Sequence, residues 1–294
     1  QELVRAKILP VPLNFGTLQD VFAYLNALPE KIVVVIDEYP YLKAMNDSAT
    51  VDSIFQNIID NRLVNIELIL SGSHIGMMKD ALQEKNALYG RFAVTIKLNE
   101  LNYLEAAKFY PDKTPYDKAA HYAVFGGSPF VNQALQPTAT IRENIISTIL
   151  NPMSAVYLYA SQLLLSDYSV KINAERIFSV IGNGKKRYTE IEDKLDVKKT
   201  GNLSKQIKSL IDLEIIARNS PINKIGDNKK STFEINDNLL RFYFTFIYKN
   251  ASALQVLGAE AFYDEYIAPA LTDFISRRFE GICRDYFSHQ VRSG

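Results

Sequence analysis

The stretch that most constrains the fold of this chain is a run of five consecutive apolar residues, Ile32 to Ile36, followed at once by Asp37 and Glu38. A strand that is apolar on both faces is typical of the interior of a parallel sheet, where helices cover both sides. The two acids then stand at the carboxyl end of the strand, where open α/β sheets bind ligands. The alternative is a core strand that ends in a solvated acidic turn.

Two neighbouring carboxylates at such an edge are suited to metal-assisted hydrolysis of a phosphate. Asp37 is the candidate for holding Mg²⁺ on the phosphates of a nucleotide, because carboxylate oxygens are ligands that this ion accepts. Glu38 is the candidate for orienting or deprotonating the attacking water.

A second strand is predicted at Ile66–Leu70, after an amphipathic helix over Thr50–Asn61. A strand, a helix and a further strand in this order indicate a right-handed parallel crossover, so that both strands end at the same edge of the sheet. We therefore expect Ser71 and Ser73, which follow the second strand, to lie beside the two acids and to sense a γ-phosphate. An ordinary Ser-Gly turn is the alternative.

Two further segments carry candidate residues. Arg91 precedes an alternating segment, Val94–Leu98, that predicts a strand. This arginine is either a stabiliser of charge in phosphoryl transfer, in its own subunit or a neighbouring one, or a surface residue. Further along, Gly126 and Gly127 would let the backbone approach a flat ligand and Pro129 would fix the chain there, unless they form only a helix end and turn.

Composition narrows the class of protein. The 294 residues are long enough for two domains, and Lys and Arg balance Asp and Glu at 33 each. Charge is nevertheless uneven, because residues 171–230 hold 14 basic and 8 acidic residues, a net of +6. The single cysteine, Cys283, cannot form an intrachain disulfide, and no apolar stretch approaches the roughly 20 residues of a membrane span. We expect a cytoplasmic protein without a membrane partner.

Considered together, these segments resemble one family, the archaeal and bacterial ATPases of the AAA+/STAND type that carry a winged helix behind the ATPase core. Order and spacing agree over about residues 15–290. The matching segments are IVVVIDEYPYL at 32–42, LILSGSHIGMM at 68–78, LYGRFAVTIKLNELNYLEAAKFYPD at 88–112, FGGSPF at 125–130 and DNLLRFYFTFIYKN at 237–250.

The resemblance implies a role for each candidate residue, with ATP and Mg²⁺ as cofactors. Asp37 resembles the magnesium ligand of the Walker B motif, and Glu38 resembles the catalytic glutamate. Ser71 or Ser73 resembles the sensor of the next strand. Two further positions match as well: Arg91 resembles the arginine of the Tyr-Gly-Arg motif, and Pro129, two residues after Gly127, resembles the proline of the Gly-x-Pro turn near the adenine.

One departure from the family concerns the phosphate-cradling loop GxxxxGK[ST], which is not in this sequence. The sole Gly-Lys pair, Gly184-Lys185, is followed by Lys186 and lacks the upstream glycine. We expect the loop to precede Gln1 in a longer protein, in which case this chain by itself would not hold ATP tightly.

The basic region from about residue 170 to 250 predicts a winged helix-turn-helix. Its predicted elements are helices at Asn173–Ile181, at Thr189–Leu195 behind a capping box and at Asn202–Leu213, and paired strands at Ile215–Arg218 and Ser231–Ile235. The aromatic residues between Phe242 and Tyr248 are interpreted as core packing.

The third helix would enter a DNA major groove while basic residues neutralise phosphates. Six neutralised phosphates would give a log–log salt slope of about −5. The alternative is a protein-docking module that couples nucleotide state to the rest of the molecule. The candidate DNA contacts are Lys185, Lys186, Arg187, Lys205, Lys208, Lys229 and Lys230.

The predicted fold is therefore α/β: a parallel-sheet P-loop NTPase core, incomplete at its N-terminus, then a helical region and a winged helix. The predicted domains are 1–135 (ATPase core), 136–169 (helical lid), 170–250 (winged helix) and 251–294 (the start of a C-terminal domain). The leading hypothesis is an ATP-dependent switch. The alternatives are a DNA-binding regulator with an α/β scaffold and a homo-oligomeric platform in which Arg91 completes a neighbour's site.

Overall fold

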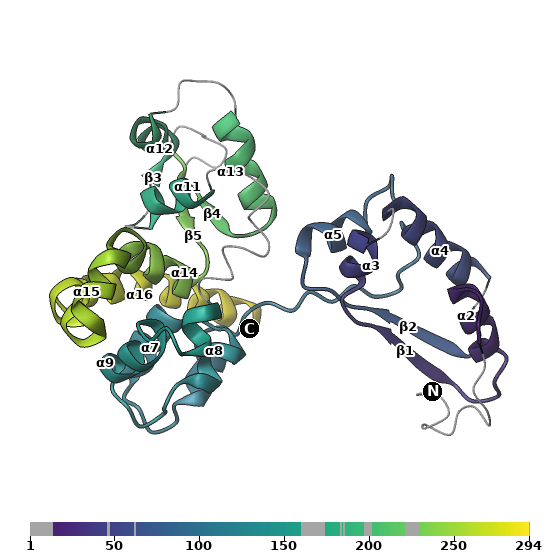
Figure 1. The fold of residues 1–294 in the computed structure, drawn as a ribbon, viewed down its shortest axis with the longest axis horizontal. Helices are drawn as coiled ribbons and strands as arrows, with labels where there is room; N and C mark the ends of the chain where they lie inside the picture. Colours follow the sequence, from purple (N-terminus) through teal and green to yellow (C-terminus); the bar gives the residue numbers. More distant parts are fainter. Residues whose placement is uncertain are drawn as a thin grey trace. The chain divides into compact units, whose positions relative to one another are not determined.

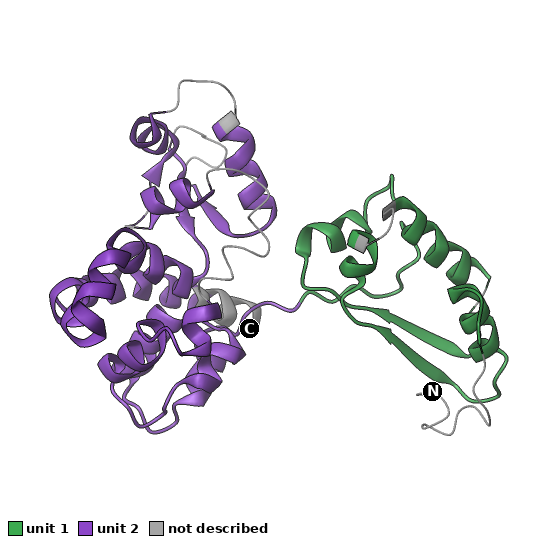
Figure 2. Ribbon diagram, in the orientation of Figure 1, with its two compact units in different colours: residues 1–97 green, residues 98–294 purple. Residues whose placement is uncertain are grey.

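The chain forms two compact units, residues 1–97 and residues 98–294 (Figure 2). The computed structural model describes residues 14–45, 48–61, 63–159, 174–182, 184, 186–196, 202–220 and 230–293. Within them the fold is mixed α/β and mostly helical, with one parallel and one antiparallel sheet (Figure 1).

Unit 1 alternates helices and strands. Its elements are α2 (Leu18–Asn26), β1 (Ile32–Ile36), α3 (Tyr39–Met45), α4 (Ser48–Asp60), β2 (Ile66–Leu70) and α5 (Ile75–Asp80). A capping box at Thr17 and Asp20 begins α2. The Thr17 side chain accepts a hydrogen bond from the amide of Asp20, and the Asp20 carboxylate accepts one from the amide of Thr17. Its apolar face then packs against α4, where the rings of Phe22 and Phe55 meet edge to face at 6.3 Å.

The predicted parallel crossover is confirmed. The two strands pair in parallel with Ile32 opposite Ile66 and Ile36 opposite Leu70, and α4 lies between them in the chain. The sheet was expected to be covered on both faces, and this expectation is wrong for the described residues. One face packs on the helices, whereas Val33 and Val35 on the other face are 57% and 56% exposed.

The predicted strand at Val94–Leu98 is absent from the structure. This segment has no regular secondary structure and pairs with no described strand. Its alternating apolar residues Val94, Ile96 and Leu98 are 72%, 78% and 90% exposed. Alternation predicts a strand only where a neighbouring strand and a core are available, and the described residues offer this segment neither.

Unit 2 contains a helical core and a small antiparallel sheet. The helical elements of the core are α6 (Tyr103–Ala106), α7 (Pro115–Phe125), α8 (Pro129–Ala134), α9 (Ile141–Asn144), α14 (Asn238–Phe242), α15 (Ala251–Phe262) and α16 (Ala268–Ser293), with π-helical segments at Ile145–Ile149, Tyr243–Ile247 and Tyr263–Ile267. Helix α7 packs against both α14 and α16, so that segments more than 100 residues apart share one core.

The sheet of unit 2 has the strand order β3-β5-β4 and is flanked by three helices (Figure 1). The elements are α11 (Ala174–Ile181), β3 (Lys186–Arg187), α12 (Tyr188–Leu195), α13 (Asn202–Asp212), β4 (Ile216–Asn219) and β5 (Thr232–Ile235). The predicted pairing of the last two strands is confirmed, with Ile216 opposite Ile235. The predicted capping box of the second helix is displaced, because Glu190 accepts from the amide of Arg187 at 2.7 Å.

The aromatic segment 242–248 is core, as predicted. Phe242 is fully buried and lies 4.9 Å from the ring of Phe246 and 5.5 Å from that of Phe274 in the helical core. Phe244, on the opposite side of the segment, packs on Phe178 below the three-stranded sheet. Because Phe242 lies in one core and Phe244 in the other, this one segment joins the two cores. Burial of each phenyl ring stabilises the fold by about 1.5–3 kcal/mol.

The observed units divide the chain differently from the predicted domains. Residues 98–135, predicted to complete the ATPase core, belong to unit 2, because Tyr110, Val124 and Phe125 are buried in the core that Phe242 and Phe274 share. Residues 251–282 also contribute to that core instead of beginning a separate domain. Among the described helices, none has the length and apolar character that a membrane crossing requires.

Gly127 shows why the chain turns tightly after α7. A Cβ atom at this position would lie 1.9 Å from the carbonyl oxygen of Leu101, which real atoms cannot approach. The same close contact is held by a hydrogen bond of 3.0 Å from the Leu101 amide to the Gly127 carbonyl oxygen. The glycine is therefore required by packing of two backbone segments in unit 2.

We predict that Gly127→Ala lowers the free energy of unfolding by about 1–3 kcal/mol, the usual penalty for overpacking a well-packed position. Urea denaturation followed by circular dichroism measures this effect. The matched control is Gly281→Ala in α16, where the new methyl group would meet Arg278 at an ordinary 3.5 Å and helix propensity favours alanine by about 1 kcal/mol. Equal stability of the two variants would contradict the assignment.

Candidate nucleotide and cation site

The first pair of candidate residues meets at the carboxyl ends of the two parallel strands. Asp37 follows β1 and Ser71 follows β2, and the Ser71 hydroxyl donates to Asp37 Oδ1 at 2.5 Å. The strand register continues for one step beyond the last apolar pair, because the Ser71 amide donates to the Ile36 carbonyl oxygen at 3.0 Å. The predicted meeting of this acid and this serine is confirmed as geometry, and the Asp37 side chain is exposed to solvent.

The second pair lies next to the first. Both carboxylate oxygens of Glu38 accept from the Ser73 amide at 3.3 Å, and the Ser73 hydroxyl donates to Glu38 Oε2 at 3.2 Å. Glu38 has a φ angle of +52°, in the left-handed region that residues other than glycine rarely adopt. Such strain is typical of functional positions, and here it lets the chain turn from β1 into α3 while the carboxylate stays on the serine.

The turn between the two serines is shaped by packing. A Cβ atom on Gly72 would lie 2.4 Å from Cδ of Pro40 and 3.0 Å from the sulfur of Met78. Only glycine fits between them, which keeps both serines directed at the acids. The sequence places Pro40 two residues after Glu38. That the proline ring packs against Gly72 follows only from the fold.

A buried polar network supports the site from beneath and was missed at the level of sequence. Asp52, on α4, accepts from the hydroxyl of Tyr39 at 2.5 Å, from Lys43 Nζ at 2.8 Å and from Asn86 Nδ2 at 2.8 Å. Burial raises the pKa of the Tyr39 hydroxyl above its usual value, and the hydrogen bond and negative charge of Asp52 act in the same direction. Asp52 lies three residues before Phe55, on the apolar face of α4, and an acid at such a position could have indicated a buried polar contact.

This network positions the polar edge of the sheet. Lys43 and Asp52 are only 5% and 4% exposed, so their charges compensate each other in a poorly hydrated environment. Tyr39 directly follows Glu38, and its own amide donates to the carbonyl oxygen of Ser71 at 2.8 Å. The start of α3 is thereby held both to α4 and to the end of β2.

Arg91 is occupied elsewhere in unit 1. Its guanidinium donates from Nε and from a terminal nitrogen to the two carboxylate oxygens of Asp60, both at 2.8 Å. It also donates to the carbonyl oxygen of Ala87 at 2.8 Å. In the parallel crossover, α4 begins near the carboxyl ends of the strands and ends near their amino ends. Asp60 is the last residue of α4 and Asp37 follows β1, so the two acids lie at opposite ends of the sheet. The structure therefore gives Arg91 a structural ion pair within the chain and does not bring it to Asp37.

Gly127 and Pro129 belong to unit 2, and the structure explains them without a ligand. Gly127 is buried against the backbone of Leu101, which occupies the place predicted for a flat ligand. Pro129 is the first residue of α8, a position that suits a residue without an amide hydrogen, and its side chain is exposed.

The described candidate DNA contacts of unit 2 are exposed or partly exposed. Lys205 and Lys208 are exposed on α13, opposite the buried stripe of Leu203, Ile207 and Leu210. Two further candidates, Lys186 and Arg187, form the short strand β3, and Lys230 is exposed just before β5. The other two, Lys185 and Lys229, lie outside the described residues.

The donor set of the site fits a magnesium–nucleotide complex better than a bare ion. In the described part of the chain, no group of three or more His, Cys, Asp and Glu side chains could hold a metal by itself. Mg²⁺ commonly binds through one or two carboxylates while nucleotide phosphates and water complete its octahedron. The exposed Asp37 carboxylate, with the Ser71 hydroxyl beside it, supplies hard oxygen atoms of the required kind.

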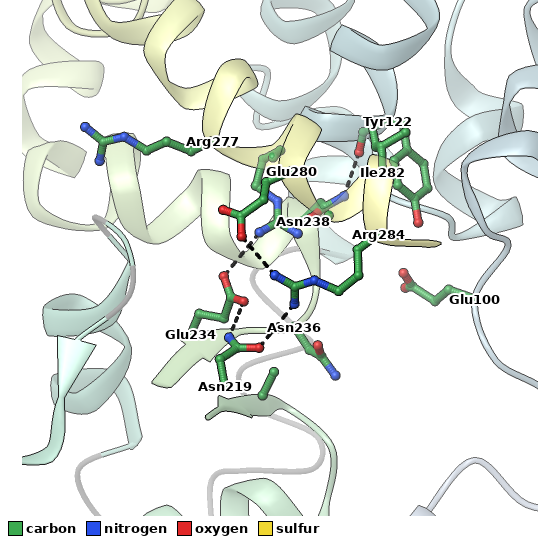
Figure 3. A pocket seen from close by; sticks show the side chains of 13 residues that line it. Glu100, Tyr122, Asn219, Glu234, Asn236, Asn238, Arg277, Glu280, Ile282 and Arg284 are labelled. Atoms are coloured by element: carbon green, nitrogen blue, oxygen red, sulfur yellow. Dashed lines mark hydrogen bonds and ion pairs between the residues drawn. The ribbon is translucent and has the colours of Figure 1, made fainter. Parts of the chain in front are cut away.

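A separate cavity of about 250 Å³ lies in unit 2 between α16, the small sheet and Glu100 (Figure 3). Two of its acids are paired with arginines. Glu234 accepts from both Arg241 and Arg278, at 3.2 and 3.3 Å, and Arg284 donates to Glu280 at 2.9 Å. These pairs make the cavity a polar seam between the sheet and the helical core.

At the rim of this cavity the carboxyl group of Glu100 lies beside that of Asp237, the residue that caps α14. Although Glu100 as a whole is exposed, loss of hydration around its carboxyl group and the negative charge of Asp237 raise its pKa to about 8. Burial also raises the pKa of Asp237, whose carboxylate accepts from the Leu240 amide at 2.5 Å. A protonated Glu100 can donate to the Asp237 carboxylate, which ties the entry into unit 2 to the start of α14.

No family model matches the chain. The chain is 28% identical over 273 residues to an uncharacterized protein, MJECL04, of Methanocaldococcus jannaschii. The similar region covers 91% of this chain but only 60% of that protein's length.

We predict that the Glu100–Asp237 pair makes the chain less stable as the pH rises from about 4.5 to about 8. The folded state keeps the Glu100 proton up to about pH 8, whereas the unfolded state loses it near 4.5, so the stabilisation is complete below 4.5 and is lost toward 8. Urea denaturation across this range should show the decline, and Glu100→Gln should reduce its slope. Exposed Glu265→Gln is the control, and an unchanged slope in Glu100→Gln would count against the pair.

Proposed function

We propose that the protein is an ATP-dependent molecular switch of the AAA+/STAND kind, in which unit 1 supplies the cation and water site of a nucleotide pocket. The observation that carries this proposal is the meeting of two acid–serine pairs, Asp37 with Ser71 and Glu38 with Ser73, at the carboxyl ends of adjacent parallel strands. Open α/β sheets bind ligands at this edge.

Each residue of the site has a definite task in this proposal. Asp37 holds the cation that accompanies the nucleotide, and Ser71 keeps the carboxylate directed along the sheet edge. Glu38 accepts the proton of the attacking water or orients that water. Ser73 holds the Glu38 carboxylate in position through its amide and hydroxyl groups. When bound, Mg²⁺ would neutralise the charge that develops on the transferred phosphoryl group.

The serines also provide a means of sensing the nucleotide. In the structure both hydroxyl groups donate to the acids. A γ-phosphate oxygen would compete for the same donors, so binding and hydrolysis would change which partner Ser71 and Ser73 hold. Because Ser71 also accepts from the Tyr39 amide through its carbonyl oxygen, such a change reaches α3 directly.

The remaining parts of the nucleotide pocket are proposed to lie in residues outside this sequence. A GxxxxGK[ST] loop is not among the 294 residues, and the chain spans 60% of the length of the Methanocaldococcus jannaschii protein that it matches. The exposed apolar face of the sheet, with Val33 and Val35 more than half exposed, is suited to further covering elements. Slow hydrolysis at the completed site would reset the switch.

We predict that full-length protein hydrolyses ATP only with Mg²⁺ and that Glu38→Gln lowers kcat by a factor of about 10²–10⁴, the usual contribution of a general base. Phosphate release measures kcat, and a fluorescent ATP analogue measures binding. Binding should persist in Glu38→Gln, whereas Asp37→Asn should weaken it in the presence of Mg²⁺.

The control for this experiment is Glu84→Gln, since Glu84 is an exposed acid of the same unit that takes no part in the proposed site. Undiminished turnover in Glu38→Gln would remove the proposed role of that residue. Absence of nucleotide binding in the full-length wild-type protein would remove the proposal as a whole.

A second candidate function, DNA binding by unit 2, is favoured by the exposed face of α13. We propose that the three helices and the β4–β5 pair form a winged helix-turn-helix in which α13 is the recognition helix. Lys205 and Lys208 are exposed on that helix while its opposite stripe is buried in the core, an arrangement that suits insertion into a major groove.

We predict that Lys205→Glu with Lys208→Glu weakens binding of a labelled duplex at least tenfold and makes the log–log salt slope less steep by about 2, because two DNA phosphates would no longer be neutralised. Fluorescence anisotropy at several salt concentrations measures both. Lys249→Glu, an exposed charge reversal elsewhere in unit 2, is the control. Equal affinities of the wild type and the double variant would exclude α13 as a DNA-binding surface.

A further inference from the structure

Glu38 has a backbone conformation that its own side-chain contacts secure only weakly. Its φ angle of +52° lies in the left-handed region, which is unfavourable for a residue with a side chain. The bonds that its carboxylate accepts from the amide and hydroxyl of Ser73 are 3.2–3.3 Å long and exposed to solvent, where hydrogen bonds stabilise a conformation only modestly. The conformation of Glu38 therefore depends on what fixes the residues that follow it.

Tyr39 fixes the chain directly after Glu38. It is 1% exposed, and its ring meets the ring of Phe55 edge to face at 5.1 Å. Its amide donates to the carbonyl oxygen of Ser71 at 2.8 Å, and its hydroxyl donates to Asp52 Oδ1 at 2.5 Å. The residue after the strained position is thus held through both its backbone and its side chain.

Asp52 divides its two carboxylate oxygens between this turn and other segments. Oδ1 accepts from Tyr39, whereas Oδ2 accepts from Lys43 Nζ and from Asn86 Nδ2, both at 2.8 Å. Lys43 balances the charge of an acid that is only 4% exposed. Asn86 brings in residues 81–90, a series of turns that follows α5.

The turn segment 81–90 is anchored near its two ends and at Asn86. Ala81 and Leu88 are 2% and 0% exposed and belong to the core of unit 1. Asn86 Oδ1 accepts from the Leu88 amide at 2.9 Å, so one side chain bonds both to its own segment and to Asp52. Movement of this segment would therefore withdraw a donor from the residue that also holds the start of α3.

We propose that Asp52 is a positioning residue that couples the order of the turn segment 81–90 to the placement of Glu38, and so regulates the activation of water at the nucleotide site. The catalytic part of this inference rests on the proposed function. With the segment in place, Asp52 keeps Tyr39 fixed and the Glu38 carboxylate stays on Ser73. With the segment displaced, the hold on Tyr39 weakens, Glu38 leaves its left-handed conformation, and the attacking water loses its base.

The Ser73 amide reports the placement of Glu38 without nucleotide, because it donates to the Glu38 carboxylate and a charge-assisted bond of this kind deshields the amide proton. In NMR spectra of the isotope-labelled 294-residue chain, Tyr39→Phe and Asn86→Ala should each move the Ser73 amide resonance upfield. Gln83→Ala is the matched control, since this exposed side chain of the same segment donates to Asp80 at 2.9 Å, and it should leave the resonance in place.

Both test variants retain the pair of Lys43 and Asp52, and circular dichroism establishes that they keep the helix content of the wild type. In the full-length protein, each should lower kcat about tenfold with binding of a fluorescent ATP analogue unchanged, because a small misplacement of a catalytic group slows the chemical step. The double variant should lose little more than Tyr39→Phe alone, because both changes act through Asp52.

Two results would overturn the coupling: a Ser73 resonance that stays in place in both variants, or losses of kcat that simply multiply in the double variant. Absence of ATP binding by the wild type would instead contradict the proposed function. The coupling of the turn segment to Glu38 would then still stand or fall with the Ser73 resonance.

Discussion

The parallel register of β1 and β2 is the constraint on which the candidate site depends. With Ile36 opposite Leu70, the next residues along each strand, Asp37 and Ser71, come within hydrogen-bonding distance. A shift of one residue would turn the apolar face of a strand away from the helices and would separate the acid from the serine. The buried contacts of β1 and β2 with α2 and α4 therefore stabilise both the core and the geometry of the polar edge.

Unit 2 depends in a similar way on a single segment, residues 238–247. Phe242 and Phe246 belong to the helical core while Phe244 belongs to the core below the small sheet. The charged residue Arg241 on the same segment meets Glu234 of β5 at 3.2 Å. A movement of the three-stranded module would therefore act directly on the helical core of unit 2.

Sequence patterns predicted the elements more reliably than their partners. The strands at Ile32–Ile36 and Ile66–Leu70, the parallel crossover and the β4–β5 pairing follow from periodicity and handedness, which are local properties. The unpaired segment Val94–Leu98 shows the limit, because alternation does not supply a neighbouring strand. Arg91 shows the same limit for a side chain: its sequence context suggested a phosphate, and the fold supplied Asp60.

The sequence by itself determined that two acids and two serines stand at the ends of apolar strands, and that a basic amphipathic helix follows later in the chain. Only the tertiary structure decided that Asp52 and Lys43 form a buried pair beneath the site, that Gly127 contacts Leu101, and that residues 98–135 join unit 2. The physical reason is range. Propensity and periodicity act over a few residues, whereas ion pairs and close backbone contacts join segments whose meeting depends on how the whole unit packs.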